Sequence, residues 1–252
     1  MKDLTGKVVL VTGGSRGIGK EISSLFAEKG ARIIVVYRSN QTQANATLVN
    51  LSGQGHTLFQ CDVSRPDEVQ LLFEQVMKTY GKVDIVINNA GIGFHHPVDQ
   101  SSYDQWREGW QQILGINLLG PANVCYQAAQ IMIQQGHGRL INVSSRGAFR
   151  GEPDQPAYGA SKAGLNSLTQ SLAHKLAPYG IFVGAVAPGF VETDMAYDRL
   201  QGEPGQRIKA QSPMNRVAKP EEVAQAVYLM ACSNQWMTGG IFDVNGASYF
   251  RT

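Results

Sequence analysis

Short apolar segments rich in valine and isoleucine alternate with helix-length segments along almost the whole chain. The apolar segments are predicted strands, at residues 7–12, 31–37, 56–61, 83–88, 139–143, 181–186 and 241–244. The segments between them have helix length, at 17–30, 41–53, 66–80, 104–135, 158–179 and 220–232. Near-continuous apolar runs are typical of strands that a parallel sheet buries on both faces. The alternation therefore predicts the α/β class, with a doubly wound, seven-stranded parallel sheet flanked by helices.

Proline and glycine mark several of the predicted helix ends. Pro66 and Pro220 each stand just inside a helix start and are followed by acidic residues, which favours helix initiation. Gly30, Gly81 and Gly180 each follow a helix end, where glycine is a common C-cap.

We expect residues 1–252 to form a single domain, because open α/β sheets of this size are commonly one unit. The only long stretch with weak patterning is 189–215, which is rich in glycine and proline. We interpret it as a lid or substrate loop, and a plain surface excursion is the alternative.

Composition excludes several classes of function. The net charge of +2 argues against nucleic acid or an anionic membrane as partner. No run of about 18 apolar residues and no apolar signal region is present, so we expect a cytoplasmic protein. The cysteines, Cys61, Cys125 and Cys232, are far apart in sequence, and we interpret them as buried thiols in a reducing compartment.

A glycine-rich turn leads from the first predicted strand into the first helix. Glycines permit a tight turn and a close approach of the backbone to a pyrophosphate, and the helix start offers free N–H groups and a positive dipole end. A purely structural turn is the alternative interpretation. The expected cofactor contacts in this turn are Gly13, Ser15, Arg16, Gly17, Ile18 and Gly19.

The T-G-x-x-x-G-x-G pattern that starts at Thr12 resembles the short-chain dehydrogenase/reductase family. About residues 5–248 follow the layout of that family. The resemblance implies a Rossmann-type domain that both binds a dinucleotide and carries the catalytic residues.

The end of the second strand indicates which cofactor is used. Enzymes that use NAD usually place an acid there to hold the ribose 2′-hydroxyl, whereas this strand ends in Tyr37 and Arg38. Arg16 in the glycine turn is a second cation nearby. Two guanidinium groups can bind a 2′-phosphate through bidentate hydrogen bonds. We therefore predict NADP(H) as the cofactor, and the alternative is that both arginines are solvated surface charges.

The resemblance implies further cofactor contacts after the third, fourth and sixth strands. Asp62 is expected to bond the adenine amino group and Val63 to line the ring pocket, although Asp62 could instead cap the helix that begins at Pro66. Thr193 is expected to bond the carboxamide, with a helix N-cap as its alternative role. The remaining expected contacts are Asn89, Ala90, Gly91, Pro188, Gly189 and Val191.

Tyr158 and Lys162 carry the predicted acid/base chemistry and also contact the cofactor. Four residues apart, they lie on one face of a helix. A neighbouring ammonium favours the phenolate and lowers the pKa of a tyrosine from about 10. Ser145, 13 residues before Tyr158, and Asn117 match the family's catalytic serine and asparagine. The resemblance implies that Ser145 bonds the substrate oxygen and that Asn117 distorts its helix and holds a water near Lys162.

The expected reaction is reduction of a ketone to a secondary alcohol by NADPH. Within the family the chain resembles bacterial 3-oxoacyl-[acyl-carrier-protein] reductases, so the substrate is a free carbonyl compound or an acyl thioester. Few cations stand where that group docks its carrier protein; Lys175 and Arg139 are the nearest. Two alternatives remain open: oxidation of a sugar, polyol or other secondary alcohol, and a non-catalytic NADP-binding sensor.

Loops after the fourth, fifth and sixth strands are expected to form the walls of the substrate pocket. Their mixture of side chains predicts a medium-sized, partly apolar substrate. His95 and His96 have no further ligand at suitable spacing, so no metal is expected. The resemblance implies a homotetramer, or a homodimer, that pairs through helices 104–135 and 158–179. The expected wall residues are Phe94, His95, His96, Arg146, Phe149, Arg150, Phe190, Met195 and Tyr197.

Overall fold

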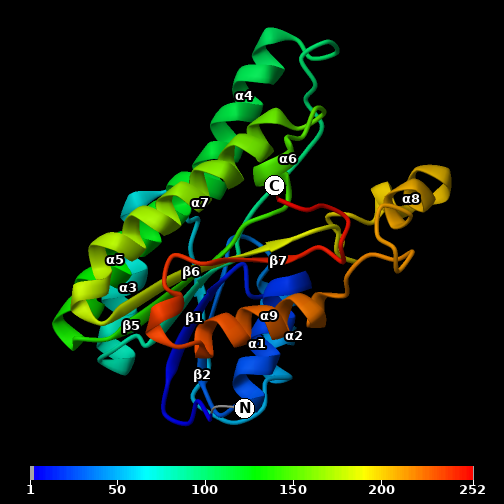
Figure 1. The fold of residues 1–252 in the computed structure, drawn as a ribbon. Coiled ribbons are helices and arrows are strands. Elements are labelled where there is room, and N and C mark those ends of the chain that lie inside the picture. The colour runs from blue at the N-terminus through cyan, green and yellow to red at the C-terminus, as the bar shows by residue number, and fades with distance from the viewer. Residues whose placement is uncertain (1–2, 252) are drawn as a thin grey trace.

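Figure 1 presents the computed structural model of the chain, which describes residues 3–251. Its strands form one sheet in the order β3-β2-β1-β4-β5-β6-β7, and every neighbouring pair is parallel. This confirms the predicted Rossmann-type α/β fold. The strands are β1 (Val8–Thr12), β2 (Arg32–Tyr37), β3 (Thr57–Gln60), β4 (Ile85–Asn88), β5 (Gly138–Val143), β6 (Ile181–Pro188) and β7 (Ile241–Val244).

Helices cover both faces of the sheet. The α-helices are α1 (Gly17–Glu28), α2 (Gln41–Val49), α3 (Pro66–Tyr80), α4 (Tyr103–Leu114), α5 (Gly120–Gln135), α6 (Gly147–Arg150), α7 (Pro156–Leu176), α8 (Gly202–Lys209) and α9 (Pro220–Cys232). A π-helical segment, η1 (Gly115–Leu119), joins α4 to α5, and the 3-10 turns are η2 (Ala177–Tyr179), η3 (Asp198–Leu200) and η4 (Gln235–Met237). Helices α3, α5 and α7 pack on one face, and α1 and α9 pack on the other (Figure 1).

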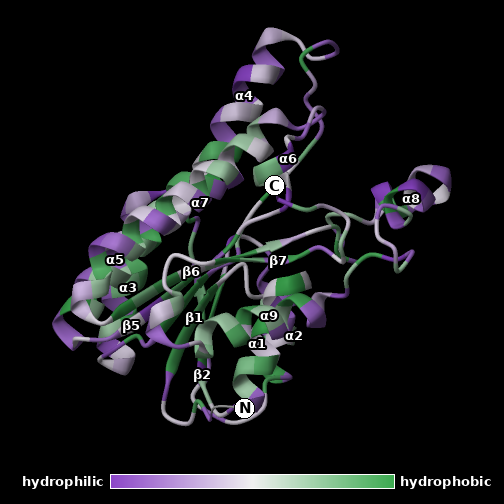
Figure 2. Ribbon diagram, viewed as in Figure 1, coloured by the Kyte–Doolittle hydropathy of each residue, from purple (hydrophilic) through white to green (hydrophobic). Residues whose placement is uncertain are grey.

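The side chains of β1 illustrate why the strands are apolar throughout. Val8 and Leu10 enter the core on the α3, α5 and α7 side, whereas Val9 and Val11 enter the core on the α1 and α9 side. Successive side chains of a strand point to opposite faces, so a strand covered on both faces needs apolar residues at every position. Figure 2 shows these hydrophobic strands at the centre and a largely hydrophilic α8 that stands apart from the sheet.

Most of the predicted elements are present, and the prolines and glycines at helix ends explain where predicted and observed bounds agree. Helix α3 begins at Pro66 and is closed by Gly81 in a left-handed conformation, as predicted. The predicted helix 41–53 ends earlier, at Val49. Strand 56–61 shortens to four residues, because pairing with β2 covers only Thr57 to Gln60.

The predicted helix 104–135 is not continuous. It begins at Tyr103, behind a capping box made by Ser102 and Gln105, and it is interrupted by η1. The predicted helix 158–179 begins two residues earlier, at Pro156, and changes to the 3-10 turn η2 at Ala177. Proline at the first helical position explains the earlier start, because its missing N–H is not needed there.

Residues 189–215 contain η3 and α8, so the stretch is more structured than its glycines and prolines indicated. Pro204 lies in the first turn of α8, where proline is tolerated. Gly205 is buried, and a Cβ atom there would collide with the carbonyl oxygen of Leu200. Pro204 and Gly205 are therefore compatible with α8 and do not interrupt it.

The three cysteines are free thiols. Cys61 and Cys125 are buried, as predicted, whereas Cys232 is partly exposed. Burial raises the pKa of both buried thiols to about 12, so neither is a reactive thiolate near neutral pH. Within residues 3–251, no helix has the length and apolar character needed to cross a membrane.

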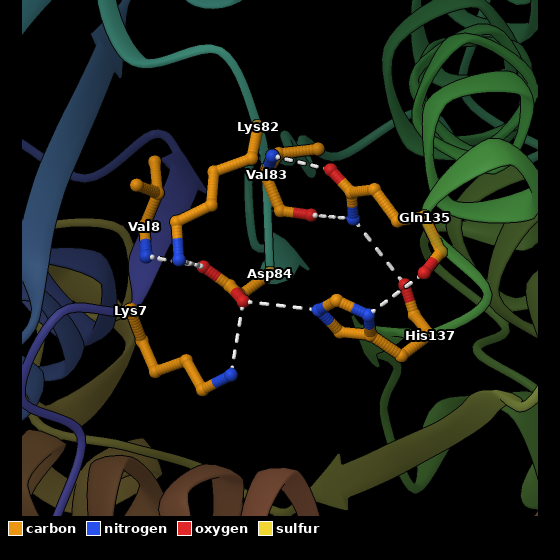
Figure 3. A network of polar contacts seen from close by, with 7 residues as sticks. All are labelled: Lys7, Val8, Lys82, Val83, Asp84, Gln135 and His137. Carbon is orange, nitrogen blue, oxygen red and sulfur yellow. Dashed lines mark hydrogen bonds and ion pairs between the residues drawn. The ribbon is translucent and has the colours of Figure 1, made fainter.

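A buried carboxylate holds together the start of β4 and its neighbours, at the end of the sheet opposite the carboxyl ends of the strands (Figure 3). The Asp84 side chain is only 2% exposed and accepts hydrogen bonds from the Val8 N–H at 2.9 Å and the Lys7 ammonium at 3.0 Å. Lys82 lies 2.9 Å away and His137 lies 3.3 Å away. Burial opposes the negative charge, but these hydrogen bonds outweigh it and lower the pKa of Asp84 to about 2.

Candidate active site

The glycine turn lies at the carboxyl end of β1 and leads directly into α1. Gly13 and Gly17 have positive φ values of 62° and 50°, which glycine adopts readily. A Cβ atom at Gly19 would collide with the carbonyl oxygen of Gly13, so helix and turn approach more closely than any side chain allows. The first turn of α1 leaves N–H groups without intrahelical partners, which suits a phosphate.

Residues after β4 are hydrogen-bonded to this turn. The Thr12 hydroxyl accepts bonds from the N–H groups of Asn89 and Ala90 at 3.0 and 3.1 Å. The Asn89 side chain donates to the carbonyl oxygens of Thr12 and Gly13, both at 3.1 Å. The Asn88 side chain instead bonds Asn142 on β5 at 2.9 Å. The structure therefore brings Gly13, Asn89 and Ala90 together, as the sequence predicted.

Arg16 and Arg38 stand at the ends of two neighbouring strands. The turn is fixed beside β2 by a bond from the Gly14 N–H to the Val36 carbonyl at 3.2 Å, while the Tyr37 side chain is buried. Both arginine side chains are exposed, and within residues 3–251 neither forms an ion pair. This edge of the sheet therefore presents two uncompensated positive charges.

Asp62 does not cap α3. Its Oδ1 accepts bonds from the N–H and the hydroxyl of Ser64 at 3.0 and 2.7 Å, and the N-cap position belongs to Arg65. The alternative capping role is therefore wrong, and the carboxylate closes the turn after β3. Val63 is buried in the core, where a Cβ atom at Gly120 would lie 2.7 Å from its side chain.

Tyr158, Lys162 and Ser145 lie together at the carboxyl end of β5. The Lys162 ammonium donates to the carbonyl oxygen of Val143 at 2.8 Å and lies 5.8 Å from the centre of the Tyr158 ring. The Ser145 side chain acts on the Tyr158 hydroxyl and lowers its pKa, and Ser145 Oγ accepts a bond from the Gly147 N–H at 3.0 Å. The two hydroxyl groups therefore lie on the same side of the site.

Asn117 lies in η1, the π-helical segment, and this is the helix distortion that the sequence predicted. Its Oδ1 accepts a bond from the Ile92 N–H, and its Nδ2 donates to the Ile92 carbonyl, both at 2.8 Å. A Cβ atom at Gly91 would lie 3.4 Å from Asn117 Oδ1 and 3.6 Å from Lys162 Nζ. Gly91 therefore lies between Asn117 and Lys162, and the four predicted catalytic residues form one site.

The segment after β6 closes the other side of the site. The Gly189 N–H bonds the Val244 carbonyl at 3.0 Å, and buried Val191 pairs with Ala218. The Thr193 methyl group lies over the glycine turn, 3.3 Å from where a Gly17 Cβ atom would stand. Thr193 caps none of the helices that the structure describes, so its alternative role is wrong.

A model of the family described as "Enoyl-(Acyl carrier protein) reductase" matches residues 13–247. The chain is 35% identical over 250 residues to the 3-oxoacyl-[acyl-carrier-protein] reductase of Synechocystis sp., and the alignment covers 98% of each chain. The chain belongs to the short-chain dehydrogenase/reductase family.

Other members of the family agree with this assignment. Carbonyl reductase family member 4 of Xenopus laevis is 37% identical over 95% of this chain and 97% of its own. The crystal structure of gox2181 superposes with a TM-score of 0.90 at 31% identity, covering 98% of this chain and 96% of that one. The protein is accordingly an oxidoreductase of this family, whose members use a NAD(P) cofactor. The glycine turn, whose Gly13 and Gly17 adopt positive φ values and which leads into the free N–H groups of α1, fits such a cofactor.

The pKa values at the site differ from the simple expectation. Burial lowers the pKa of Lys162, which is 5% exposed, to about 8. Burial raises the pKa of Tyr158 above its ordinary value, and the hydrogen bond from Ser145 opposes this only partly. The sequence predicted that Lys162 would lower the pKa of Tyr158, but burial outweighs any such effect in the protein without cofactor. Because its pKa is raised, Tyr158 is protonated near neutral pH, which suits a proton donor.

Two charged residues near Tyr158 were not identified from the sequence as parts of the site. Glu152 raises the pKa of Tyr158 and Arg199 lowers it, so both charges act at the Tyr158 hydroxyl. Glu152 is six residues before Tyr158, in the loop between α6 and α7, where the sequence could have indicated it. Arg199 lies in η3 and is brought there only by the fold of the 189–215 segment.

Some of the residues that were predicted to form the walls of the substrate pocket line a cavity in the structure. Phe94, His95 and His96 line a cavity of about 530 Å³ against α4. His96 is buried, and its ring contacts the Phe94 carbonyl at 2.9 Å and the Ala157 N–H at 3.3 Å, so it holds the loop against the start of α7. Within residues 3–251, no group of three or more histidine, cysteine, aspartate or glutamate side chains is placed to hold a metal ion.

Proposed function

We propose that the protein is an NADPH-dependent reductase that converts a ketone to a secondary alcohol, with Tyr158 as the general acid. The observation that carries the proposal is that Ser145, Tyr158, Lys162 and Asn117 meet beside the glycine turn. Lys162 and Asn117 flank Gly91, and Tyr158 lies next to Lys162 and Ser145. These four residues come from three elements, the loop after β5, η1 and α7, and they would not need to meet there for stability alone.

The cofactor would lie across the carboxyl ends of the strands, with its pyrophosphate on the first turn of α1. The family resemblance assigns the adenine to Asp62 and Val63 and the nicotinamide to the segment from Pro188 and Gly189 to Val191 and Thr193. Arg16 and Arg38 would bind the 2′-phosphate, since both are exposed and unpaired within residues 3–251. When bound, the nicotinamide supplies the hydride.

The chain's own residues then handle the proton. Ser145 would donate a hydrogen bond to the carbonyl oxygen and hold it beside the Tyr158 hydroxyl. Tyr158 would protonate the oxygen as negative charge develops on it. Lys162 would bind the cofactor ribose, and Asn117 would hold a water that returns a proton through the lysine.

We propose that the substrate is a free small molecule and not an acyl group attached to a carrier protein. Arg139 is one of the two cations that lie nearest to the expected docking site of a carrier protein. It faces inward, with its guanidinium 4.8 Å from the Phe182 ring centre and bonded to the Ser233 carbonyl at 2.7 Å. An acidic carrier protein would therefore meet little positive charge there.

The test is NADPH oxidation with an acetoacetyl thioester beside a panel of simple ketones. We expect saturable turnover of at least one ketone, a kcat/KM at least about tenfold higher with NADPH than with NADH, and no turnover by Tyr158→Phe, which retains NADPH binding. Full activity of Tyr158→Phe would refute the catalytic assignment, and equal kcat/KM with both cofactors would refute the roles of Arg16 and Arg38.

We also propose that copies of the chain pair through α4–α5 and α7. Tyr103, Leu119 and Tyr126 expose large apolar side chains along α4–α5, which a partner copy would cover. Light scattering at micromolar concentration is expected to give the mass of a tetramer or dimer, and a monomer mass would contradict the proposal.

A further inference from the structure

A cluster of arginines surrounds Phe190, at the start of the segment after β6. The Arg146 guanidinium lies 5.1 Å from the Phe190 ring centre and the Arg199 guanidinium lies 4.9 Å from it. Arg146 comes from the loop after β5 and Arg199 from η3. We name Arg146, Arg150 and Arg199 the arginine cluster, because the charges of Arg150 and Arg199 both act on Arg146.

Arg146, the buried member of this cluster, forms no ion pair with a carboxylate of residues 3–251. It is 3% exposed, and its side chain donates to two neutral acceptors, Ser248 Oγ at 2.5 Å and Gln211 Oε1 at 2.6 Å. Burial and the neighbouring charge of Arg150 lower its pKa to about 10. A charge buried without an ionic partner is costly, so its presence calls for an explanation.

The two other members are exposed and available. Arg150 and Arg199 are exposed side chains, and among residues 3–251 no member of the cluster forms an ion pair. Within residues 3–251, Glu152 is the carboxylate whose charge acts on Arg146. Three guanidiniums against one carboxylate leave the region positive.

The cluster adjoins the reacting groups and not the predicted phosphate site. Arg146 follows Ser145 directly in sequence, and its N–H bonds the Pro188 carbonyl at 2.9 Å. The charge of Arg199 acts on the Tyr158 hydroxyl. Arg16 and Arg38 instead belong to the ends of β1 and β2, so the arginine cluster would face the substrate.

We propose that the arginine cluster binds an anionic group of the substrate, so that the preferred ketones are oxo acids or phosphorylated carbonyl compounds. This inference rests on the function proposed above. Arg150 and Arg199 would contact the carboxylate or phosphate, whose oxygens match the planar guanidinium fork. Buried Arg146 is a positioning residue that holds Phe190, the 189–215 segment and the C-terminal segment in place while adding its charge.

The test compares matched pairs of ketones at pH 6.5: 3-oxobutanoate and 4-oxopentanoate against their methyl esters, and hydroxyacetone phosphate against hydroxyacetone. We expect kcat/KM for at least one anionic compound to exceed that of its neutral partner by about tenfold or more. The ratio should fall as salt rises, because the contacts are partly exposed. The carboxylate and phosphate pairs distinguish the two sources of the anion.

Arg199→Gln and Arg150→Gln are expected to reduce that anionic-to-neutral ratio by about fivefold or more each, mainly through KM. The matched control is Arg207→Gln, an exposed arginine of α8 that pairs with Glu203 at 2.5 Å, and it should leave the ratio unchanged. A purely structural role would change both members of a pair equally. An unchanged ratio in the two variants, or no anionic preference in the parent enzyme, would overturn the proposal.

A binding measurement separates this inference from the proposed reaction. Titration of 4-oxopentanoate and its methyl ester into enzyme saturated with NADP⁺, followed by calorimetry, needs no turnover. Tighter binding of the acid that Arg199→Gln abolishes would support the anion site even if no ketone were reduced, in which case only the proposed function fails. Equal binding together with normal turnover of neutral ketones would refute the anion site alone.

Discussion

Replacing Asp84 by asparagine is expected to remove a defined share of the protein's stability. The pKa of Asp84 is lowered from its ordinary 3.8 to about 2, and each tenfold change in proton affinity is worth about 1.4 kcal/mol. The charged form therefore contributes about 2.5 kcal/mol to the free energy of unfolding at neutral pH. Asparagine keeps the shape but leaves Lys7 and Lys82 without their shared anion.

The stabilisation by ionised Asp84 is expected to decrease as the pH falls. A carboxylate whose pKa is lower in the folded state stabilises the protein above its unfolded pKa, and the contribution disappears as the pH falls through the folded value. The difference in unfolding free energy between parent and Asp84→Asn should be about 2.5 kcal/mol at pH 5 to 7 and about half of that at pH 3. Urea unfolding at fixed protein concentration measures it.

The matched control for this measurement is Asp99→Asn, which removes a carboxylate from an exposed loop. Its unfolding free energy should follow that of the parent within about 0.5 kcal/mol at every pH. A difference between parent and Asp84→Asn that does not change between pH 7 and pH 3 would refute the reasoning, because the loss would then come from packing and not from charge.

Three further predictions concern the active site. Gly19→Ala should weaken NADPH binding by about 100-fold, measured by fluorescence titration, because the new methyl group collides with the Gly13 carbonyl; Lys20→Ala on the same helix is the control, and unchanged affinity in Gly19→Ala would contradict the close approach. Asn117→Ala should cost about 2–4 kcal/mol of unfolding free energy and lower kcat, because it leaves the N–H and the carbonyl of Ile92 without their partner; an unchanged melting temperature would show that η1 does not need this side chain. Burial is the largest cause of the raised pKa of Tyr158, and the charge of Glu152 adds to it, so Glu152→Gln should lower that pKa. The loss of reductase activity at high pH should then begin at a lower pH in the variant than in the parent. If the alkaline limb of the kcat/KM profile stays in place or moves to a higher pH, the effect is excluded.

The sequence predicts the glycine turn and the elements around it well because they depend on local geometry. The turn needs residues without side chains at fixed spacings, and the uninterrupted apolar run of β1 and the caps of α3 are equally local signals. The π-helical segment is different. It depends on Asn117 reaching Ile92, 25 residues earlier. Such a tertiary contact leaves no periodic signal, so the distortion at Asn117 is indicated only by the family resemblance and not by the regular helical pattern around it.

The substrate side is harder to predict because its charges meet only in the folded chain. Arg146 and Arg199 belong to segments 53 residues apart, and Phe190 joins them through ring contacts that neither segment indicates alone. Composition gave a net charge of +2 and no sign of a concentrated positive region. The fold concentrates positive charge beside Tyr158 while the Asp84 cluster places compensated charge at the opposite end of the sheet. The buried charge of Asp84, which stabilises the fold, is therefore paired, whereas the arginine cluster, which forms no ion pair within residues 3–251, lies where a substrate would arrive.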